Sequence, residues 1–142
     1  MEINEKGLAL IKLYEGRRLQ AYQDQKGIWT IGYGHTGPEV QKGLIWGPVE
    51  AEQNLMNDLK IKAYPLWDFV TEQVNENQWS ALCSLCFNVG LTAVKNSRTL
   101  KLVNDGQDPT VEWLGFSHIN GVPNAGLLNR RKAELELYHE IG

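Results

Sequence analysis

The sequence predicts an α+β fold that is mostly helical and carries one small antiparallel sheet near its N-terminus. Apolar residues recur at helical spacing before residue 16 and again after residue 47. Between these segments, residues 17–36 form a β-rich run that is broken only by glycines. A chain of 142 residues with 42% hydrophobic residues suits one compact domain with a sizeable core, and two lobes are compatible with this length.

The first helix is expected over residues 3–15. Asn4 is a candidate N-cap, and Gly16 stands where a C-terminal glycine cap belongs. Residues 17–36 follow as the antiparallel sheet. Trp29, Ile31 and Tyr33 alternate along it, so one face is expected to pack and the other to look into a cleft.

A long helix is expected over about residues 48–64, after a loop over residues 37–47 that is rich in glycine and proline. Pro48 suits the first turn of this helix, and Pro65 stops it. At about 1.5 Å per residue, the helix is long enough to join a sheet lobe, residues 17–47, to a helical lobe. The cleft would then lie between the lobes.

The helical lobe is expected to comprise residues 65–142 together with the N-terminal helix. Asn75 caps a helix of residues 76–89, whose apolar residues lie nearly all round it, so this helix should be the buried core. Within residues 66–74, Trp67, Phe69 and Val70 are expected to pack as a short helix. Further helices are expected over residues 97–104 with Ser97 as cap, 108–114 and 127–140, and residues 116–125 should be irregular.

Three side chains near the sheet can carry chemistry: Glu15, Asp24 and Thr30. Two opposed carboxyls are the minimum apparatus for cleaving a glycosidic bond. Glu15 would lie at the negative end of the first helix, which favours the protonated form that a general acid needs. Asp24 lies in a polar turn, QDQKG, and should stay ionised as a base or charge stabiliser. The hydroxyl of Thr30 can hold a water for attack.

The stretch Tyr14–Thr36, YEGRRLQAYQDQKGIWTIGYGHT, resembles the active-site segment of phage-type lysozymes, the endolysins of glycoside hydrolase family 24. Nearly every position of the family frame EG-x-x-L-x-A-Y-x-D-x-x-G-x-W-T-I-G-Y-G-H-T is present. The resemblance covers essentially the whole chain, because it continues in Glu50-Ala51-Glu52, Phe87-Asn88-Val89-Gly90, Gly126-Leu127, Arg130-Arg131 and Glu134. It weakens around Phe116 and Ile119.

This resemblance implies a lysozyme-like two-lobed fold and one catalytic domain over residues 1–142. It implies a muramidase that hydrolyses the β-1,4 bond between N-acetylmuramic acid and N-acetylglucosamine in peptidoglycan, without a metal or organic cofactor. Glu15 would be the general acid, and Asp24 with Thr30 would activate water. The expected substrate-binding residues are Gly34, Thr36, Phe87, Asn88 and Ser97, although for Phe87 a place in the core alone is an equal alternative.

The stereochemical outcome depends on the distance between the two carboxyls. Direct attack by water inverts the anomeric centre and needs about 6.5–9.5 Å, whereas a covalent route needs about 5–5.5 Å. A threonine placed to hold water favours inversion. Two alternatives stay open: a lytic transglycosylase of the same fold, which would have no need for Asp24 and Thr30, and a non-catalytic glycan-binding virion protein.

Charge and hydropathy exclude some partners. A net charge of −3 gives no basic footprint for nucleic acid, and no apolar run approaches the roughly 20 residues of a membrane span. The polar N-terminus, MEINEKG, is not a signal peptide. The resemblance therefore implies a monomer made in the host bacterial cytoplasm, which reaches the wall in the periplasm through a holin-type pore. A local basic patch, Arg17, Arg18 and Lys26 or Arg130, Arg131 and Lys132, could face the anionic wall.

Several other residues that could bind a metal or carry charge are expected to have structural roles. Cys83 and Cys86 fall on an apolar helical stripe and should be buried thiols, since a zinc site needs about four ligands. His35 is expected to pair with Asp58 on the next helix. Arg130 and Arg131 form a solvated face, or one of them reaches the Glu15 carboxyl.

Overall fold

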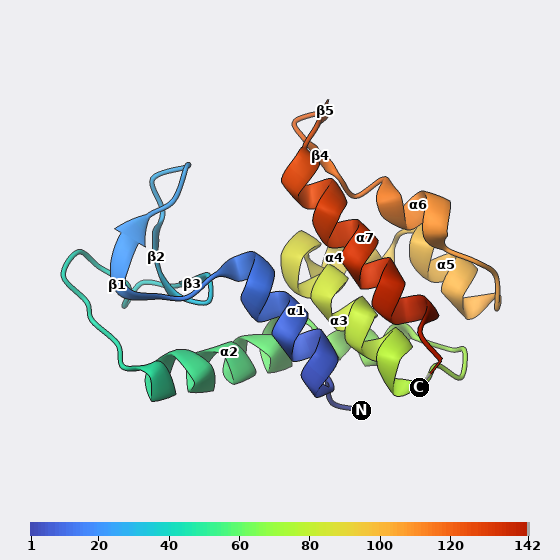
Figure 1. Ribbon diagram of the computed structural model, residues 1–142, viewed down its shortest axis with the longest axis horizontal. Coiled ribbons are helices and arrows are strands. Elements are labelled where there is room, and N and C mark those ends of the chain that lie inside the picture. The colour runs from blue at the N-terminus through green and yellow to red at the C-terminus, as the bar shows by residue number, and fades with distance from the viewer. Residues whose placement is uncertain (142) are drawn as a thin grey trace.

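The computed structural model of the protein describes residues 1–141, so the last residue of the predicted helical lobe lies outside the description (Figure 1). The fold is α+β and mostly helical, as predicted. Helix α1 (Glu5–Glu15) leads into a small sheet, and α2 (Pro48–Lys62) leads from the sheet to the remaining helices. Figure 1 shows the sheet at one end of the molecule, the helices at the other, and α2 running along one edge between them.

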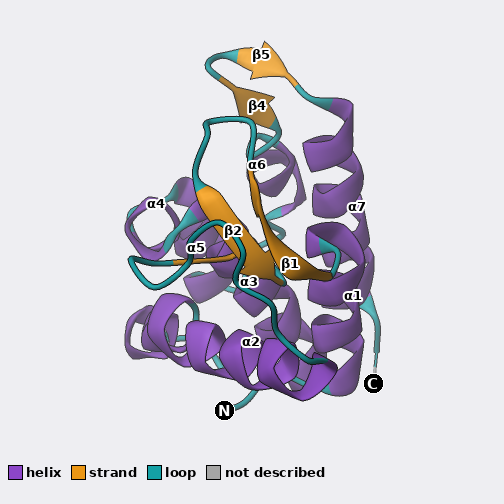
Figure 2. Cartoon of the chain, turned by 90° about the vertical axis from the view of Figure 1, so that its left-hand side faces the viewer, coloured by secondary structure: helices purple, strands orange, loops and turns teal. Residues whose placement is uncertain are grey.

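The sheet has three antiparallel strands in sequence order: β1 (Arg18–Gln23), β2 (Trp29–Gly32) and β3 (His35–Thr36). Gln23 pairs with Trp29, and Thr30 pairs with Thr36. The sheet packs on a small hydrophobic cluster of its own, formed by Ile31, Val40, Trp46 and Ala51. Figure 2 shows the sheet above α2, which supplies Ala51 to this cluster. Trp29 and Tyr33 pack against the cluster as partly buried residues.

The helical lobe is built around α3 (Glu76–Val89), which is buried on nearly every side, as predicted. It packs against α1 and against α7 (Ala125–His139). The larger hydrophobic core gathers here and includes fully buried Trp79, Leu82 and Leu85. The surrounding elements are the 3₁₀ helix η1 (Tyr64–Phe69), α4 (Leu91–Lys95), α5 (Arg98–Asn104) and α6 (Thr110–Leu114).

The predicted helix caps are confirmed. Asn4 accepts a hydrogen bond from the N–H of Gly7, and Asn75 accepts one from the N–H of Gln78. Both side chains satisfy backbone donors that the first helical turn leaves without a partner.

The helical lobe differs from the prediction in two places. Residues 116–125 contain a short hairpin, β4 (His118–Ile119) and β5 (Val122–Pro123), instead of irregular chain. Its turn, Asn120-Gly121, has positive φ at both residues. Helix α4 was not predicted. The short helix expected within residues 66–74 is confirmed as η1, which begins two residues earlier and ends at Phe69.

Cys83 and Cys86 are free thiols in the core, as predicted. Burial raises the pKa of both, that of Cys86 to about 12, because an apolar surrounding disfavours the thiolate.

Candidate active site

Glu15 is the last residue of α1 and faces the sheet lobe. Gly16 ends the helix: it adopts φ of +70°, and its N–H donates to the carbonyl of Lys12. The Glu15 side chain is 19% exposed. The turn between β2 and β3 lies against it, because a Cβ added to Gly34 would stand 2.7 Å from Glu15 Oε1. A bare backbone at position 34 therefore allows the two lobes to meet at this carboxyl.

The other carboxyl oxygen of Glu15 is paired with Arg130. The distance from Arg130 Nη1 to Glu15 Oε2 is 2.6 Å. Arg130 comes from α7 and is buried, as is Arg131. Of the two alternatives for these residues, the solvated face is wrong, and the contact of one arginine with the Glu15 carboxyl is confirmed. The carboxyl that the sequence places at the negative end of the helix dipole thus lies against a guanidinium.

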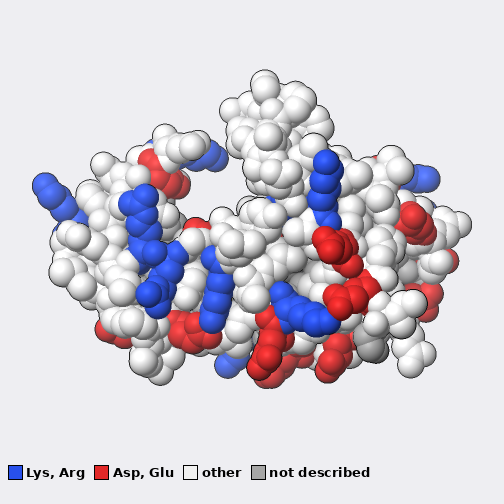
Figure 3. Space-filling view, in the orientation of Figure 1, with Lys and Arg blue, Asp and Glu red and all other residues white. Residues whose placement is uncertain are grey.

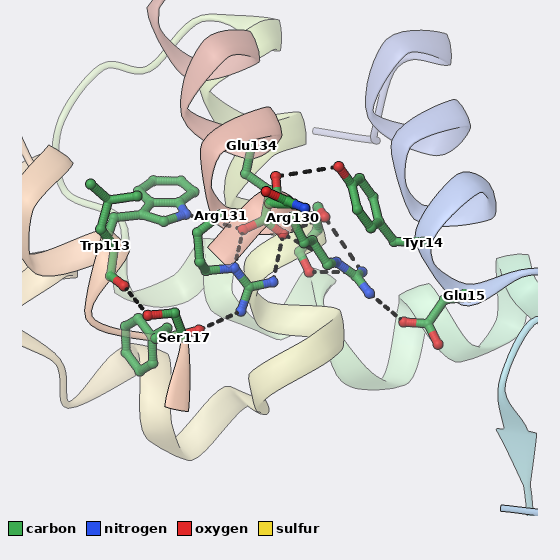
Figure 4. A network of polar contacts seen from close by, with 11 residues as sticks. Tyr14, Glu15, Trp113, Ser117, Arg130, Arg131 and Glu134 are labelled. Atoms are coloured by element: carbon green, nitrogen blue, oxygen red, sulfur yellow. Dashed lines mark hydrogen bonds and ion pairs between the residues drawn. The ribbon is translucent and has the colours of Figure 1, made fainter. Parts of the chain in front are cut away.

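Arg130 belongs to a buried polar network around Glu134 (Figure 4). Arg131 Nε lies 2.7 Å from Glu134 Oε1, and Arg130 Nε lies 3.4 Å from Glu134 Oε2. Glu134 also accepts hydrogen bonds from the Trp113 indole and the Ser84 hydroxyl. Two guanidiniums thus share two carboxylates, Glu134 and Glu15, so the network is electrically balanced when Glu15 is ionised.

Asp24 is held by its own turn in the sheet lobe. Its Oδ1 accepts from the N–H of Lys26 at 2.8 Å and from the N–H of Ile28 at 2.9 Å. Thr30 is buried, and its hydroxyl donates to the carbonyl of Ile28 at 2.9 Å. The peptide units around Ile28 therefore orient both side chains. The proton of the Thr30 hydroxyl is used in this way, which leaves its oxygen free to accept.

A cavity of about 300 Å³ opens beside Glu15 on the helical side. Its walls come from the ends of α1 and α3, from β4, and from the start of α7; they are Tyr14, Glu15, Asn88, Ile119, Asn124, Gly126, Leu127 and Arg130. Figure 3 shows the surface hollowed between the sheet lobe and the β4–β5 hairpin. Sequence reasoning did not place Ile119 here, because it treated residues 116–125 as irregular.

The predicted substrate-binding residues do not all come together. Gly34 touches Glu15, Asn88 lines the cavity, and Thr36 is exposed on β3 as the pairing partner of Thr30. Phe87 is in the large hydrophobic core. Ser97 caps α5, with its hydroxyl accepting from the N–H of Leu100, and it lines a different cavity.

His35 is clamped between two carboxylates. Its Nδ1 lies 2.8 Å from Asp58 on α2, which confirms the predicted pair, and its Nε2 lies 2.6 Å from Glu39, which was not predicted. Burial alone would lower the pKa of His35, but the hydrogen bonds to Glu39 and Asp58 outweigh it and raise that pKa. The histidine in turn lowers the pKa of Glu39. The clamp ties β3, and with it the turn at Gly34, to α2.

Within residues 1–141, no three His, Cys, Asp or Glu side chains are arranged so that they could hold a metal ion. The described helices include none that is long and apolar enough to cross a membrane.

The chain matches a family model described as phage lysozyme over residues 12–134. It is 41% identical to the endolysin of Acyrthosiphon pisum secondary endosymbiont phage 1, over 97% of this chain and 98% of that one. It is 33% identical to the endolysin of Bacillus phage PZA, but it spans only 55% of that protein's length. A crystal structure of a point mutant of P22 lysozyme superimposes with a TM-score of 0.88, 33% identity and 99% coverage of both chains. The chain therefore belongs to the phage lysozyme family and is an enzyme of the lysozyme type, a hydrolase of peptidoglycan.

Proposed function

We propose that the enzyme is an N-acetylmuramidase that hydrolyses the β-1,4 bond between N-acetylmuramic acid and N-acetylglucosamine, with Glu15 as the general acid. The observation that carries the proposal is the position of the Glu15 carboxyl. It stands where the two lobes meet, with one oxygen against Gly34 and the other on Arg130, and it opens into a cavity. A sugar chain in the cleft would bring a glycosidic oxygen within its reach.

Asp24 and Thr30 would activate the attacking water. The Thr30 oxygen and the Asp24 carboxylate each accept a hydrogen bond from one water, whose lone pair then faces the anomeric carbon. Proton transfer from Glu15 to the leaving oxygen cleaves the glycosidic bond, and the water oxygen bonds to the anomeric carbon with inversion while one of its protons passes to Asp24. The Asp24 carboxylate stabilises the positive charge that develops on the sugar ring.

Arg130 has a role in the same cycle. The ion pair at Glu15 is the arrangement expected after the proton has been given to the leaving group, because Glu15 is then a carboxylate. Glu15 must be protonated again before the next turnover. The proton that Asp24 has taken from the water is released to solvent, and solvent supplies the proton that Glu15 takes up.

The test is lysis of outer-membrane-stripped Gram-negative cells by the wild type and by Glu15→Gln. Loss of a general acid lowers the rate by about 10²–10⁴-fold, with the fold retained. Full activity in Glu15→Gln overturns the assignment. Mass spectrometry of the released sugars identifies the reaction, since hydrolysis gives reducing ends whereas a lytic transglycosylase gives anhydro-muramic ends. NMR of the first-formed anomer decides between inversion and retention.

The route to the wall is part of the proposal. We propose synthesis in the host cytoplasm, passage through a holin-type pore and action as a monomeric single domain, and the similarity to phage endolysins supports this route. Expression with and without a co-expressed holin measures the dependence directly through the time of lysis. Sedimentation of the purified protein measures its oligomeric state.

A further inference from the structure

The two lobes carry charge of opposite sign. Residues 16–47, which form the sheet lobe and its loop, contain four lysine and arginine residues and two carboxylates, a net charge of +2. The rest of the chain contains ten lysine and arginine residues and fifteen carboxylates, a net charge of −5. The overall charge of −3 therefore conceals a positive end on a negative molecule.

The four cations form what we call the basic rim: Arg17, Arg18, Lys26 and Lys42, all of them exposed. Lys and Arg side chains gather over the sheet lobe in Figure 3, on one side of the hollow. Arg17 is two residues beyond Glu15, and the backbone of Lys26 binds Asp24. The basic rim thus begins beside both candidate catalytic carboxyls.

The charge of the basic rim is not neutralised within the lobe. Among the ion pairs of residues 1–141, none joins a carboxylate to any of the four side chains. The guanidinium of Arg18 lies over the ring of Tyr22, 4.3 Å from the ring centroid, and not against a carboxylate. The two carboxylates of the lobe are engaged elsewhere, Glu39 with His35 and Asp24 with backbone N–H groups.

We propose that the basic rim binds the carboxylates of the peptide stems of peptidoglycan. This inference rests on the proposed function, because stems project from the muramic acid residues of a glycan strand lying in the cleft. A guanidinium or ammonium pairs with a carboxylate, and the field of four like charges turns this end of a negatively charged enzyme toward an anionic wall. The basic rim recognises the stems, and the cleft recognises the glycan.

The experiment compares two quadruple variants with the same change in net charge. One replaces the basic rim: Arg17→Gln, Arg18→Gln, Lys26→Gln and Lys42→Gln. The matched control replaces four cations at or near the surface of the rest of the molecule: Lys60→Gln, Lys95→Gln, Arg98→Gln and Lys101→Gln. Binding is measured by co-sedimentation with purified sacculi in the Glu15→Gln background, so that no strand is cut during the measurement.

We expect the basic-rim variant to bind sacculi about tenfold more weakly at low salt, and the control to change less than about twofold, given the typical weight of exposed ion pairs. The difference should vanish near 0.5 M salt, where charges a few Å apart are screened. It should also vanish on sacculi whose stem carboxylates have been converted to neutral amides. An equal loss in the control, or a loss that persists on amidated sacculi, overturns the proposal.

Failure of the proposed function would give a different result. A wild type that releases no reducing ends from intact sacculi, whose stems are all present, is not a muramidase, whatever its binding to sacculi. The co-sedimentation measurement judges the basic rim alone, because it involves no bond cleavage.

Discussion

Glu15 and Asp24 lie in different lobes, and different kinds of contact hold them. Glu15 pairs with Arg130, which is 115 positions away in sequence. Arg130 in turn forms an ion pair with a buried carboxylate, Glu134. Asp24 is held by backbone N–H groups two and four positions away. One carboxyl thus depends on the tertiary fold, and the other depends on a single turn.

This difference predicts how each lobe responds to damage. A buried charge that loses its partner is costly, because no water is available to solvate it. A carboxyl at a solvent-accessible turn can be replaced by a neutral acceptor without such a cost. The helical lobe should therefore lose stability when its polar network is altered, whereas the sheet lobe should lose activity first.

The largest expected effect is on activity, from Asp24→Asn. The amide oxygen of asparagine can still accept the two backbone hydrogen bonds, but the negative charge is gone. We expect the rate of reducing-end release to fall about 10²–10⁴-fold and the thermal unfolding midpoint to stay close to that of the wild type. A rate near the wild-type value would show that the charge at position 24 has no part in the reaction.

The next effect is on stability, from Glu134→Ala. It leaves Arg131 fully buried without its carboxylate partner, and we expect the free energy of unfolding to fall by about 3–5 kcal/mol. Urea denaturation measures it. Glu136→Ala, an exposed position on the same helix, is the control and should cost about 0.5 kcal/mol or less. Similar losses in the two variants would contradict the role given to the buried network.

Gly34→Ala tests the point where the lobes meet. Gly34 has φ of +77°, so any side chain costs about 1–2 kcal/mol of backbone strain, and here its Cβ would also strike Glu15. Gly43 has φ of +91° with open space around it. Gly43→Ala should thus lower stability to a similar extent and leave the rate intact, while Gly34→Ala should lower the rate about tenfold or more. Equal rates in the two variants would show that the contact between the Gly34 turn and Glu15 does not affect the reaction.

The smallest effect is the pH dependence that His35 contributes. Its pKa is raised in the folded protein, so its pairing stabilises the fold fully below the unfolded pKa of about 6.5 and loses this contribution as pH rises through the folded pKa. The free energy of unfolding is measured for wild type and for His35→Gln at pH 5.5 and at pH 9. The difference between the two proteins should be larger at pH 5.5 than at pH 9. Asp58→Asn should remove more of this dependence than Glu39→Gln, because Asp58 is buried and Glu39 is exposed. If the free energies of unfolding of wild type and His35→Gln differ by the same amount at both pH values, the pairing of His35 with Asp58 and Glu39 does not contribute to the pH dependence.

The sequence predicted what depends on neighbouring residues. Asn4 and Asn75 cap their helices, and residues 76–89 form the buried helix, because capping and periodicity are local rules. The pair between His35 and Asp58 was also predicted. The signal for the β4–β5 hairpin was present and was not used, since Asn-Gly flanked by Ile and Val is typical of a tight hairpin turn.

The helical side of the site could not be predicted in the same way. Arg130 and Arg131 look like surface residues at the start of a helix, and their burial depends on Glu134, Trp113 and Ser84, which lie on three different helices. An assignment based on hydrophobic periodicity places every charged residue on the solvent-exposed face of its helix. It therefore cannot identify charges that are buried together, nor choose which arginine reaches Glu15.

Ile28 illustrates a position whose importance does not lie in its side chain. Its amide and its carbonyl serve Asp24 and Thr30 at once, while the side chain itself is 48% exposed. Any amino acid other than proline, which has no amide hydrogen to give, can therefore keep both contacts. A main-chain shift at position 28, in contrast, would displace the side chains of Asp24 and Thr30 together.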